Sequence, residues 1–407
     1  MYNTVKIFFK HHLLKQKLKK QNVVIDFSLK EKDKKHVLIV DDKVPEFDKD
    51  SGSRRLTEII KILIKNGYKV SLLANVKEYK FNTTNVSFFR KLGVNVYQPA
   101  VSPNGKLVTR ERFLKTIVGD LSYVWLHRPG IFTKYYPLVK AINPNVPVVF
   151  DMVDFHYLRM KREAELTNDP AKHKIAQEHL KEEMENCKRA DKIIVISDMD
   201  KDALLEFYNE EAKMEVIGNI HDHINRPADF KTFSERDGLL FIGGFAHAPN
   251  EDAVLYLHDK VMPLVWEKHP GMKVNIVGSN PTKAVLDLNS AQFAIVGYVE
   301  DASVYFTKAK VFVALLRYGA GIKGKIGQSL EYSLPLVTTA VGAEGFDFSD
   351  YRGNMVAETP EELANLILKL YNDETLWNEI SHASADFIAP YSLKNVEQAV
   401  IRLLHGL

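Results

Sequence analysis

Short apolar runs alternate with longer segments of helical periodicity along most of the chain. In the clearest helical segment, 53–66, five apolar side chains recur every three or four residues and share one face. A second helical segment, 158–189, is strongly charged and is predicted to break at Asn168-Asp169-Pro170. This alternation of strand-like and helical segments is typical of βαβ units around a parallel sheet.

The strand-like runs form two series, separated by a polar stretch at 226–238 that we interpret as a linker. The first series is predicted at 37–41, 69–73, 94–98, 123–127, 146–150, 192–197 and 215–217. The second is predicted at 239–242, 273–277, 293–296, 311–316, 336–339 and 355–357.

A chain of 407 residues exceeds what one hydrophobic core usually holds, so we expect two domains. The predicted fold class is α/β, with two doubly wound domains that face each other across a cleft at the carboxyl ends of their strands. The expected divisions are a basic segment 1–35, a first domain 36–225, a second domain 226–385 and a terminal segment 386–407.

Charge is concentrated at the start of the chain. Residues 1–35 contain ten lysines and three acidic residues, whereas the whole chain has a net charge of +3. Apolar and basic positions mix over 4–20, which favours either contact with an anionic membrane surface or a helix that packs on its own domain. The single cysteine, Cys187, favours a reducing cytoplasm, and no apolar run reaches the roughly 20 residues that span a bilayer. We therefore expect a cytoplasmic protein, and the first interpretation of 4–20 would place it at the inner face of the cell membrane.

The run from Arg317 to Glu331 carries the most specific chemistry. A loop with three glycines and the cations Arg317, Lys323 and Lys325 follows a buried strand and opens into a helix. Backbone N–H groups at a helix N-terminus and nearby cations suit a phosphate-bearing ligand, and Gly321 allows close approach of the backbone. The alternative is an ordinary strand-to-helix turn.

Other loops that follow predicted strands supply further candidates. In the second domain these are Gly243, Gly244 and His247 in one loop, and Tyr298 and Val299 in another. In the first domain they are Ser51 and Gly52, His127, and the group Asp151, Asp154 and His156. Because the carboxyl ends of parallel strands share one edge of a sheet, each set is expected to face the cleft.

These motifs resemble the donor-binding segments of retaining nucleotide-sugar glycosyltransferases of the GT-B fold, family four, and especially bacterial surface-polysaccharide enzymes. The resemblance implies two Rossmann-like domains and a terminal helix that crosses back to the first. It implies that Arg317, Lys323 and Lys325 neutralise the donor diphosphate. The Gly243-Gly244 loop and His247 would then contact the donor, and Tyr298 and Val299 would lie beside its base.

In the first domain the resemblance implies that His127 faces the donor sugar. Asp154 or His156 would bind acceptor hydroxyls or act as a base, and the Ser51-Gly52 loop would lie near the donor phosphate and the acceptor.

The chain departs from the family pattern at the two glutamates of the donor helix and its loop. Gln328 stands where the ribose-binding glutamate is usual, and Ala320 stands where many relatives have a second one. Gln328 can accept a hydroxyl hydrogen bond but is neutral, and Glu331 is a possible substitute. Relatives also carry an Arg and a Lys in the loop that holds Gly244 and Asn250 here, so more of the diphosphate charge would fall on Arg317, Lys323 and Lys325.

The predicted function is transfer of a sugar from a nucleotide-sugar to a saccharide or lipid-linked acceptor in surface polysaccharide synthesis, with no cofactor and no metal. Two alternatives stay open, a non-catalytic relative that serves as a binding partner and a nucleotide-sugar epimerase. A dinucleotide dehydrogenase is disfavoured because the first strand lacks the Gly-x-Gly-x-x-Gly fingerprint. No nucleic-acid-binding module is recognisable.

Overall fold

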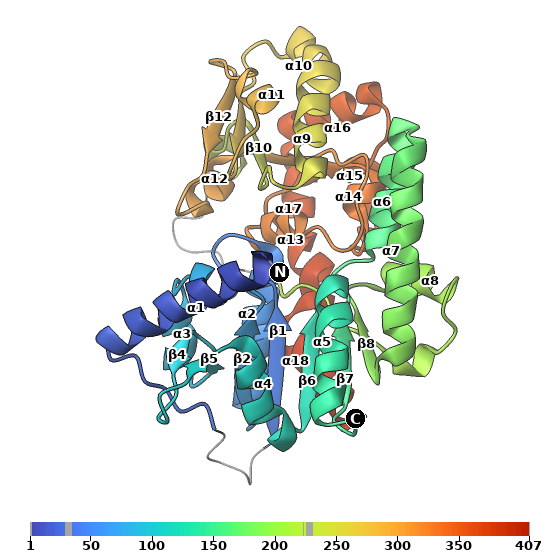
Figure 1. Cartoon of the computed structure of the whole chain (residues 1–407). Helices are drawn as coiled ribbons and strands as arrows, with labels where there is room; N and C mark the ends of the chain where they lie inside the picture. Colours follow the sequence, from blue (N-terminus) through green and yellow to red (C-terminus); the bar gives the residue numbers. More distant parts are fainter. Residues whose placement is uncertain (1, 29–34, 223, 225–230, 407) are drawn as a thin grey trace.

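Seven parallel strands form the sheet of the first domain. The computed structural model describes residues 2–28, 35–222, 224 and 231–406, and places this sheet in the lower half of the molecule (Figure 1). The strand order is β3-β2-β1-β6-β7-β8-β9. The strands are β1 (His36–Asp41), β2 (Lys69–Ala74), β3 (Asn95–Val96), β6 (Tyr123–His127), β7 (Val148–Asp151), β8 (Lys192–Val195) and β9 (Met214–Val216).

Helices cover both faces of this sheet because successive residues of its central strands point to opposite sides. Val37 and Ile39 join the apolar cluster under α2, while Leu38 and Val40 join the cluster under α4 and α5. The helices are α2 (Ser51–Lys65), α3 (Val86–Lys91), α4 (Arg110–Ile117), α5 (Pro129–Ile142), α6 (His156–Thr167), α7 (Pro170–Arg189) and α8 (Asp198–Leu205).

The second domain has a five-stranded parallel sheet in the order β12-β11-β10-β13-β14. Its strands are β10 (Leu239–Ile242), β11 (Val274–Val277), β12 (Phe293–Gly297), β13 (Val311–Ala314) and β14 (Leu336–Thr338). Its helices are α9 (Ala248–Tyr256), α10 (Met262–Lys268), α11 (Lys283–Leu286), α12 (Ser303–Lys308), α13 (Gly324–Glu331), α14 (Ala340–Ala343), α15 (Arg352–Met355), α16 (Pro360–Asn372) and α17 (Glu374–Ile388). The predicted α/β class with two doubly wound domains is confirmed.

Two elements connect the halves of the molecule. The last helix, α18 (Leu393–His405), packs beside α2, where Val396, Val400 and Leu403 join the first-domain core. The α6–α7 hairpin rises from the first domain along the flank of the second (Figure 1). The predicted boundary at 225/226 lies outside the described residues. The described remainder of the linker is tied to the second domain by Arg236, which donates to the carbonyls of Phe306 and Ala309.

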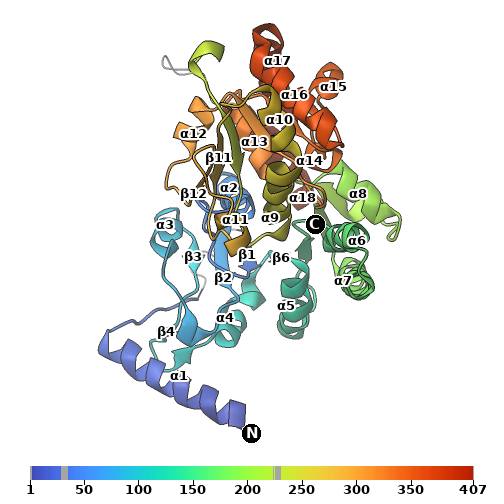
Figure 2. The same ribbon diagram turned by 90° about the horizontal axis from the view of Figure 1, so that it is seen from above.

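Helix α1 (Tyr2–Lys20) lies at the outer edge of the first domain, against the antiparallel hairpin β4 (Ala100–Val101) and β5 (Leu107–Val108). Figure 2 shows it on the side of that hairpin, away from the second domain. Leu14 and Leu18 pack on the hairpin, whereas Phe8, Phe9 and Leu13 are more than half exposed. No described helix is long and apolar enough to cross a membrane.

Most predicted strands are present with ends shifted by one or two residues, and 123–127 and 239–242 are correct to the residue. The helix break at Asn168 is confirmed, because that residue is left-handed (φ 49°) and Asp169 caps α7. The predicted strand at 355–357 is wrong. Met355 ends α15, and only a single bridge joins Val356 to Thr338, so no ladder forms.

Candidate active site

The Gly319–Lys325 loop joins β13 to α13 at the edge of the second domain that faces the first. Gly319 (φ 152°) and Gly321 (φ 67°) adopt backbone angles that favour glycine. A side-chain carbon on Gly321 would lie 3.0 Å from Ile196 and 3.5 Å from the Asp200 carboxylate, both in the first domain. The loop is therefore held directly against the first domain.

Lys323 and Lys325 lie at the N-terminus of α13, as the sequence predicts. Lys323 is 8% exposed and its Nζ lies 3.2 Å from Oε2 of Glu344. Lys325 donates to Oδ1 of Asn250 and lies 4.7 Å from the ring centre of Phe241, with no carboxylate partner among the described residues. Burial, with a smaller contribution from Lys323, lowers the pKa of Lys325 to about 7.

The Gly243-Gly244 loop follows β10 and approaches Lys325. A side-chain carbon on Gly243 would lie 3.1 Å from Nζ of Lys325 and 2.8 Å from Nδ2 of Asn250. His247 extends from the same loop between the domains. Loss of water there, together with Lys325 and Arg159, lowers the pKa of His247 to about 4. The imidazole is therefore neutral and can accept or donate a hydrogen bond near pH 7.

Arg317 is directed to its own domain. Its Nε donates to Asp252 over 2.9 Å, and its guanidinium lies 5.0 Å from the ring centre of Tyr256. The sequence assigned Arg317 to the diphosphate, but Asp252 already neutralises its charge. The cations at the N-terminus of α13 are Lys323 and Lys325.

Gln328 and Glu331 lie on α13 but have different surroundings. Gln328 is half-buried. Glu331 is buried, and its carboxylate accepts two bonds from Arg54 (2.9 and 3.2 Å) and lies 2.9 Å from Nδ1 of His221. These contacts hold Glu331 against the first domain and occupy the oxygens that a ribose would need.

Tyr298 and Val299 follow β12, which is an edge strand of the second sheet. Tyr298 is 53% exposed, whereas Val299 packs against the core of its domain. The phenol ring therefore lies at the surface and is not a core aromatic.

Ser51 and Gly52 open helix α2 in the first domain. Asp50 caps the helix by accepting from the backbone N–H of Ser53 over 2.7 Å. A side-chain carbon on Gly324 would lie 2.6 Å from Cβ of Ser51. The starts of α2 and α13 therefore meet across the domain boundary.

His127 is completely buried at the end of β6. Its Nδ1 lies 3.1 Å from Oδ1 of Asp41, and its Nε2 lies 3.8 Å from Oδ2 of Asp151. Arg55 binds Asp151 through Nη1 at 2.9 Å, and Arg128 donates to Asp41 over 2.8 Å. His127 thus belongs to a closed network of charges, with no surface open to the cleft in this structure.

Asp154 and His156 lie at the end of β7 and the start of α6, facing the second domain. Oδ1 of Asp154 is 3.3 Å from Nε2 of His156, and Oδ2 accepts from Arg159 over 3.0 Å. Burial opposes ionisation of Asp154, but His156 and Arg159 lower its pKa. Burial also opposes protonation of His156, yet Asp154 and Glu183 raise its pKa.

Backbone strain marks the same strand ends. Arg128 (φ 87°) and Val153 (φ 70°) are left-handed, although Val153 is β-branched. Residues held in such conformations cluster at functional sites, where neighbouring contacts compensate the cost. Here the amide of Val153 donates to Oδ1 of Asp151, and that of Arg128 donates to the Asp151 carbonyl.

Sequence reasoning missed the charges that first-domain helices bring to the Gly319–Lys325 loop. Arg162 donates to the Gly319 carbonyl over 2.7 Å and pairs with Glu344 at 2.7 Å. Asp200 is buried beside the loop, and burial raises its pKa to about 6. The spacing of Arg159 and Arg162 on one helical face was a usable signal, but only the fold shows that this face meets the loop.

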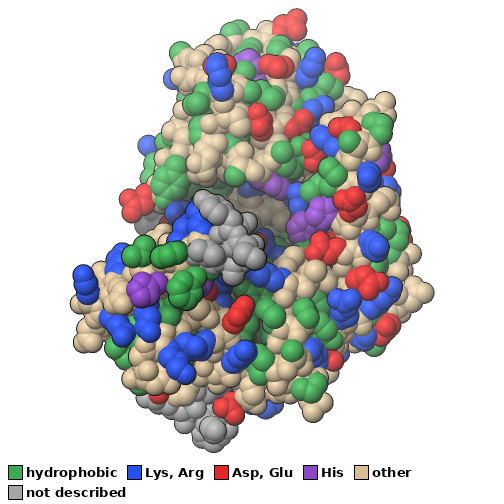
Figure 3. Space-filling model, viewed as in Figure 1, with side chains coloured by type: hydrophobic (Ala, Val, Ile, Leu, Met, Phe, Trp, Pro, Cys, Tyr) green, Lys and Arg blue, Asp and Glu red, His purple; other side chains and the backbone are tan. Residues whose placement is uncertain are grey.

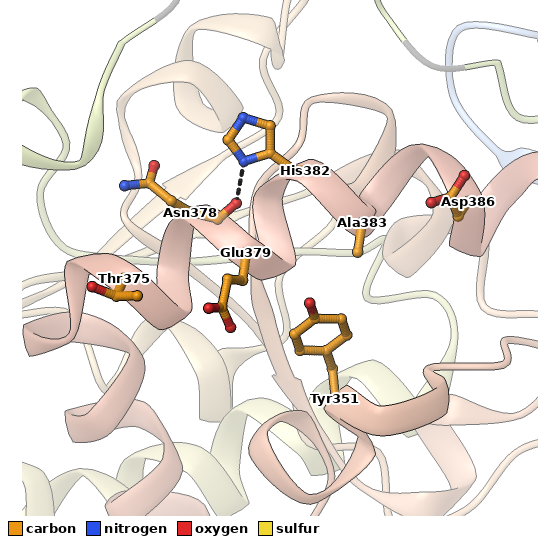
Figure 4. A pocket seen from close by; sticks show the side chains of 7 residues that line it. All are labelled: Tyr351, Thr375, Asn378, Glu379, His382, Ala383 and Asp386. Atoms are coloured by element: carbon orange, nitrogen blue, oxygen red, sulfur yellow. Dashed lines mark hydrogen bonds between the residues drawn. The ribbon is translucent and has the colours of Figure 1, made fainter.

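Figure 3 shows a hollow between the two domains with histidine and basic side chains at its rim. A separate hollow lies on the second domain, between Tyr351 and one face of α17 (Figure 4). Its polar lining comes from Thr375, Asn378, Glu379, His382 and Asp386, and it includes none of the residues described above.

Comparison with known proteins adds a domain match and a fold match. Residues 236–373 match the family model described as Glycosyl transferases group 1. No curated protein matches the chain by sequence.

Solved structures share the architecture over nearly the whole chain. Anabaena Alr3699/HepE in complex with UDP-glucose has a TM-score of 0.65 and 13% identity, covering 91% of this chain and 100% of that one. TarM has a TM-score of 0.70 and 12% identity, covering 93% and 100%. A glycosyltransferase from Rickettsia africae ESF-5 has a TM-score of 0.63 and 14% identity, covering 91% and 98%. At these identities the likeness shows the fold.

Proposed function

We propose that this chain is a glycosyltransferase of the GT-B architecture that transfers a sugar from a nucleotide-sugar to a saccharide or lipid-linked acceptor. We propose further that the transfer retains the anomeric configuration, uses no metal, and contributes to a surface polysaccharide. UDP-sugars are the first donors to test, because Alr3699/HepE was solved with UDP-glucose.

The observation that carries the proposal is the unbalanced charge of Lys325. Its ammonium group is held at the N-terminus of α13 beside the Gly243 loop, and no described carboxylate balances it. A cation that is partly removed from water and has no acidic partner is costly, and an anionic ligand removes that cost. A donor diphosphate has the charge and the oxygen acceptors for this position, and charge that develops on the leaving group would be stabilised there.

We assign the sugar end of the donor to the space that His247, Asp154 and His156 border. His247 belongs to the donor domain, whereas Asp154 and His156 come from the facing edge of the first domain. Asp154 is ionised near pH 7 and can accept a hydrogen bond from an acceptor hydroxyl. His127 supports this edge from below through Asp41 and Asp151 rather than by contact with the sugar.

The decisive test is binding of UDP, GDP and dTDP to the intact chain by calorimetry, followed by turnover of the matching sugars with a panel of acceptors. Lys325→Gln should weaken binding of the preferred nucleotide roughly 30-fold, about 2 kcal/mol. Lys283→Gln is the matched control, because Lys283 is exposed and, among the described residues, its ion pair is with Asp287 at the end of α11. Proton NMR of the first-formed product reports retention or inversion.

Each failure of this test points to a different function. Binding of a nucleotide-sugar without turnover supports the non-catalytic binding partner. Conversion of the donor without an acceptor supports the epimerase. Absence of nucleotide binding overturns the proposal.

We also propose that α1 brings the enzyme to an anionic membrane, consistent with a lipid-linked acceptor. The helix binds its own domain through Leu14, Leu18 and the contact of His11 with Glu78 (3.2 Å), so both predicted interpretations of this segment can hold together. Phe8, Phe9 and Leu13 remain exposed among lysines, and 2–20 contains no acidic residue. Exposed aromatic side chains beside basic ones suit the headgroup region of an anionic bilayer.

Flotation with vesicles tests this assignment. The protein should float with vesicles that contain phosphatidylglycerol and should remain in the bottom fraction with vesicles of pure phosphatidylcholine. The triple variant Phe8→Ser, Phe9→Ser, Leu13→Ser should lose flotation while nucleotide binding is unchanged. Equal flotation of variant and parent would remove α1 from the interface.

A further inference from the structure

One face of helix α13 docks on the first domain. Gly324, Gly327 and Glu331 recur at helical spacing and all three meet first-domain side chains. The opposite face carries Ile326 and Leu330 into the core of the second domain. The helix that presents Lys323 and Lys325 to the donor is therefore also a contact between the domains.

The glycines on this face are needed for close approach. A side-chain carbon on Gly324 would lie 2.6 Å from Cβ of Ser51, and one on Gly327 would lie 2.3 Å from Nε2 of His221. Both distances are shorter than side-chain carbons tolerate, so the face accepts no larger residue without movement of the domains. His221 itself is 3% exposed and packs edge-on against the ring of Tyr391.

Glu331 ends the docking face with a charge. Its carboxylate receives Arg54 from α2 through two nitrogens and lies 2.9 Å from Nδ1 of His221. The side chain of Glu331 is 3% exposed and that of Arg54 is 42% exposed, so the pair is buried on one side and screened on the other. Bidentate Arg–carboxylate geometry fixes orientation as well as distance.

We propose that Gly327, Glu331, Arg54 and His221 form an interdomain latch that positions α13, and with it Lys323 and Lys325, for productive donor binding. The latch rests on the proposed function in one respect only, since its catalytic effect requires a nucleotide-sugar donor. Its structural effect, docking of the two domains, is measurable without any ligand. The four are positioning residues, because they meet one another across the domain boundary and would act on the donor through the placement of α13.

A size-complementation experiment tests the latch. Gly327→Ala suits a helix in isolation, since alanine favours helices over glycine by about 1 kcal/mol, yet it cannot fit against His221. We expect a larger radius of gyration by X-ray scattering, and a donor KM raised roughly tenfold with a smaller change in kcat, as overpacking costs imply. Gly327→Ala with His221→Ala should reverse most of both changes, because the clash is removed while Arg54 still holds Glu331. Gly353→Ala on α15, where the added carbon meets nothing within 4 Å, is the matched control.

The charged half of the latch is tested by a double-mutant cycle. Arg54→Gln and Glu331→Gln should each raise the donor KM by roughly fivefold, and the double variant should cost little more than either alone. Lys61→Gln is the control on the same helix, because Lys61 is bound only to Glu58. Retained circular dichroism and melting temperature of the second domain separate mispositioning from unfolding.

The outcomes separate this inference from the proposed function. If the parent protein binds no nucleotide, the proposed function fails, and the scattering of Gly327→Ala still decides whether the domains are latched. If Gly327→Ala leaves both the scattering and the KM unchanged, or if His221→Ala does not reverse most of both changes, the latch is wrong. Additive effects of Arg54→Gln and Glu331→Gln would count against the charged half.

Discussion

The two domains meet with edges of opposite electrostatic character. At the first-domain edge, Asp41, His127 and Asp151 are enclosed by Arg55 and Arg128, so acidic and basic groups neutralise one another inside the protein. At the second-domain edge, Lys323 has Glu344 but Lys325 has no described acidic partner. The charges at the first-domain edge are balanced without a ligand, whereas the charge of Lys325 at the second-domain edge is not.

The two edges illustrate two kinds of charge, one balanced within a closed network and one left unbalanced. A closed network stabilises the fold, or at least costs much when one member is removed. A cation left unbalanced costs stability in the free protein, and that cost is recovered when an anion binds. Mutations at the two edges should therefore move stability in opposite directions.

Removal of the Asp151 charge should have the largest effect. Asp151→Asn leaves Arg55 charged and fully buried, and it also weakens the bond from Trp125 Nε1 (3.0 Å). We expect a loss of roughly 3–5 kcal/mol in the free energy of unfolding, the range for a broken buried pair. Chemical denaturation measures it. A loss below about 1 kcal/mol would mean that the network is not what holds this edge.

Removal of the Lys325 charge should instead stabilise the free protein. Lys325→Met keeps the length of the side chain but removes the unbalanced ammonium group, so the melting temperature should rise while affinity for the nucleoside diphosphate falls roughly 30-fold, about 2 kcal/mol. Thermal unfolding and calorimetry on the same sample give both numbers. A variant that is less stable and binds equally well would reverse the comparison between the edges.

The pKa of Lys325 predicts how nucleotide affinity depends on pH. In the free protein burial lowers this pKa to about 7, and a bound diphosphate raises it again. Below pH 7 the lysine is already charged and affinity is constant. Above pH 7 binding requires uptake of a proton, so affinity should fall by up to about tenfold per pH unit until the pKa of the complex is reached. Calorimetry in buffers of different ionisation enthalpy measures the uptake directly, and no uptake at pH 8 would exclude Lys325 as the contact.

The sequence predicted the two doubly wound domains because periodicity and apolar runs are local properties. It also placed Lys323 and Lys325 at a helix N-terminus, since the order of strand, glycine loop and helix is local too. The roles of Arg317 and Glu331 could not be predicted in the same way. Arg317 pairs with Asp252, 65 residues away, and Glu331 pairs with Arg54, 277 residues away.

Those partners depend on how the domains dock, and no local pattern encodes it. The glycines of α13 illustrate the point. The sequence offered Glu331 as a substitute ribose contact, whereas Gly324, Gly327 and Glu331 pack against Ser51, His221 and Arg54 of the first domain. Glycine on a helix indicates that something lies close, but only the fold says whether it is a ligand or another domain.

Gln328 gives the smallest and most specific prediction. If it lies beside the donor ribose, Gln328→Glu should strengthen binding of UDP about threefold, because a carboxylate accepts hydroxyl hydrogen bonds more strongly than an amide. The gain should vanish with 2′-deoxy-UDP, which lacks the hydroxyl in question, whereas a general change in the site would persist with both nucleotides. Equal affinities of parent and variant for UDP would place the ribose elsewhere. Because Glu331 is already bound by Arg54 and His221, the search would then move to the exposed ring of Tyr298 and the backbone around it.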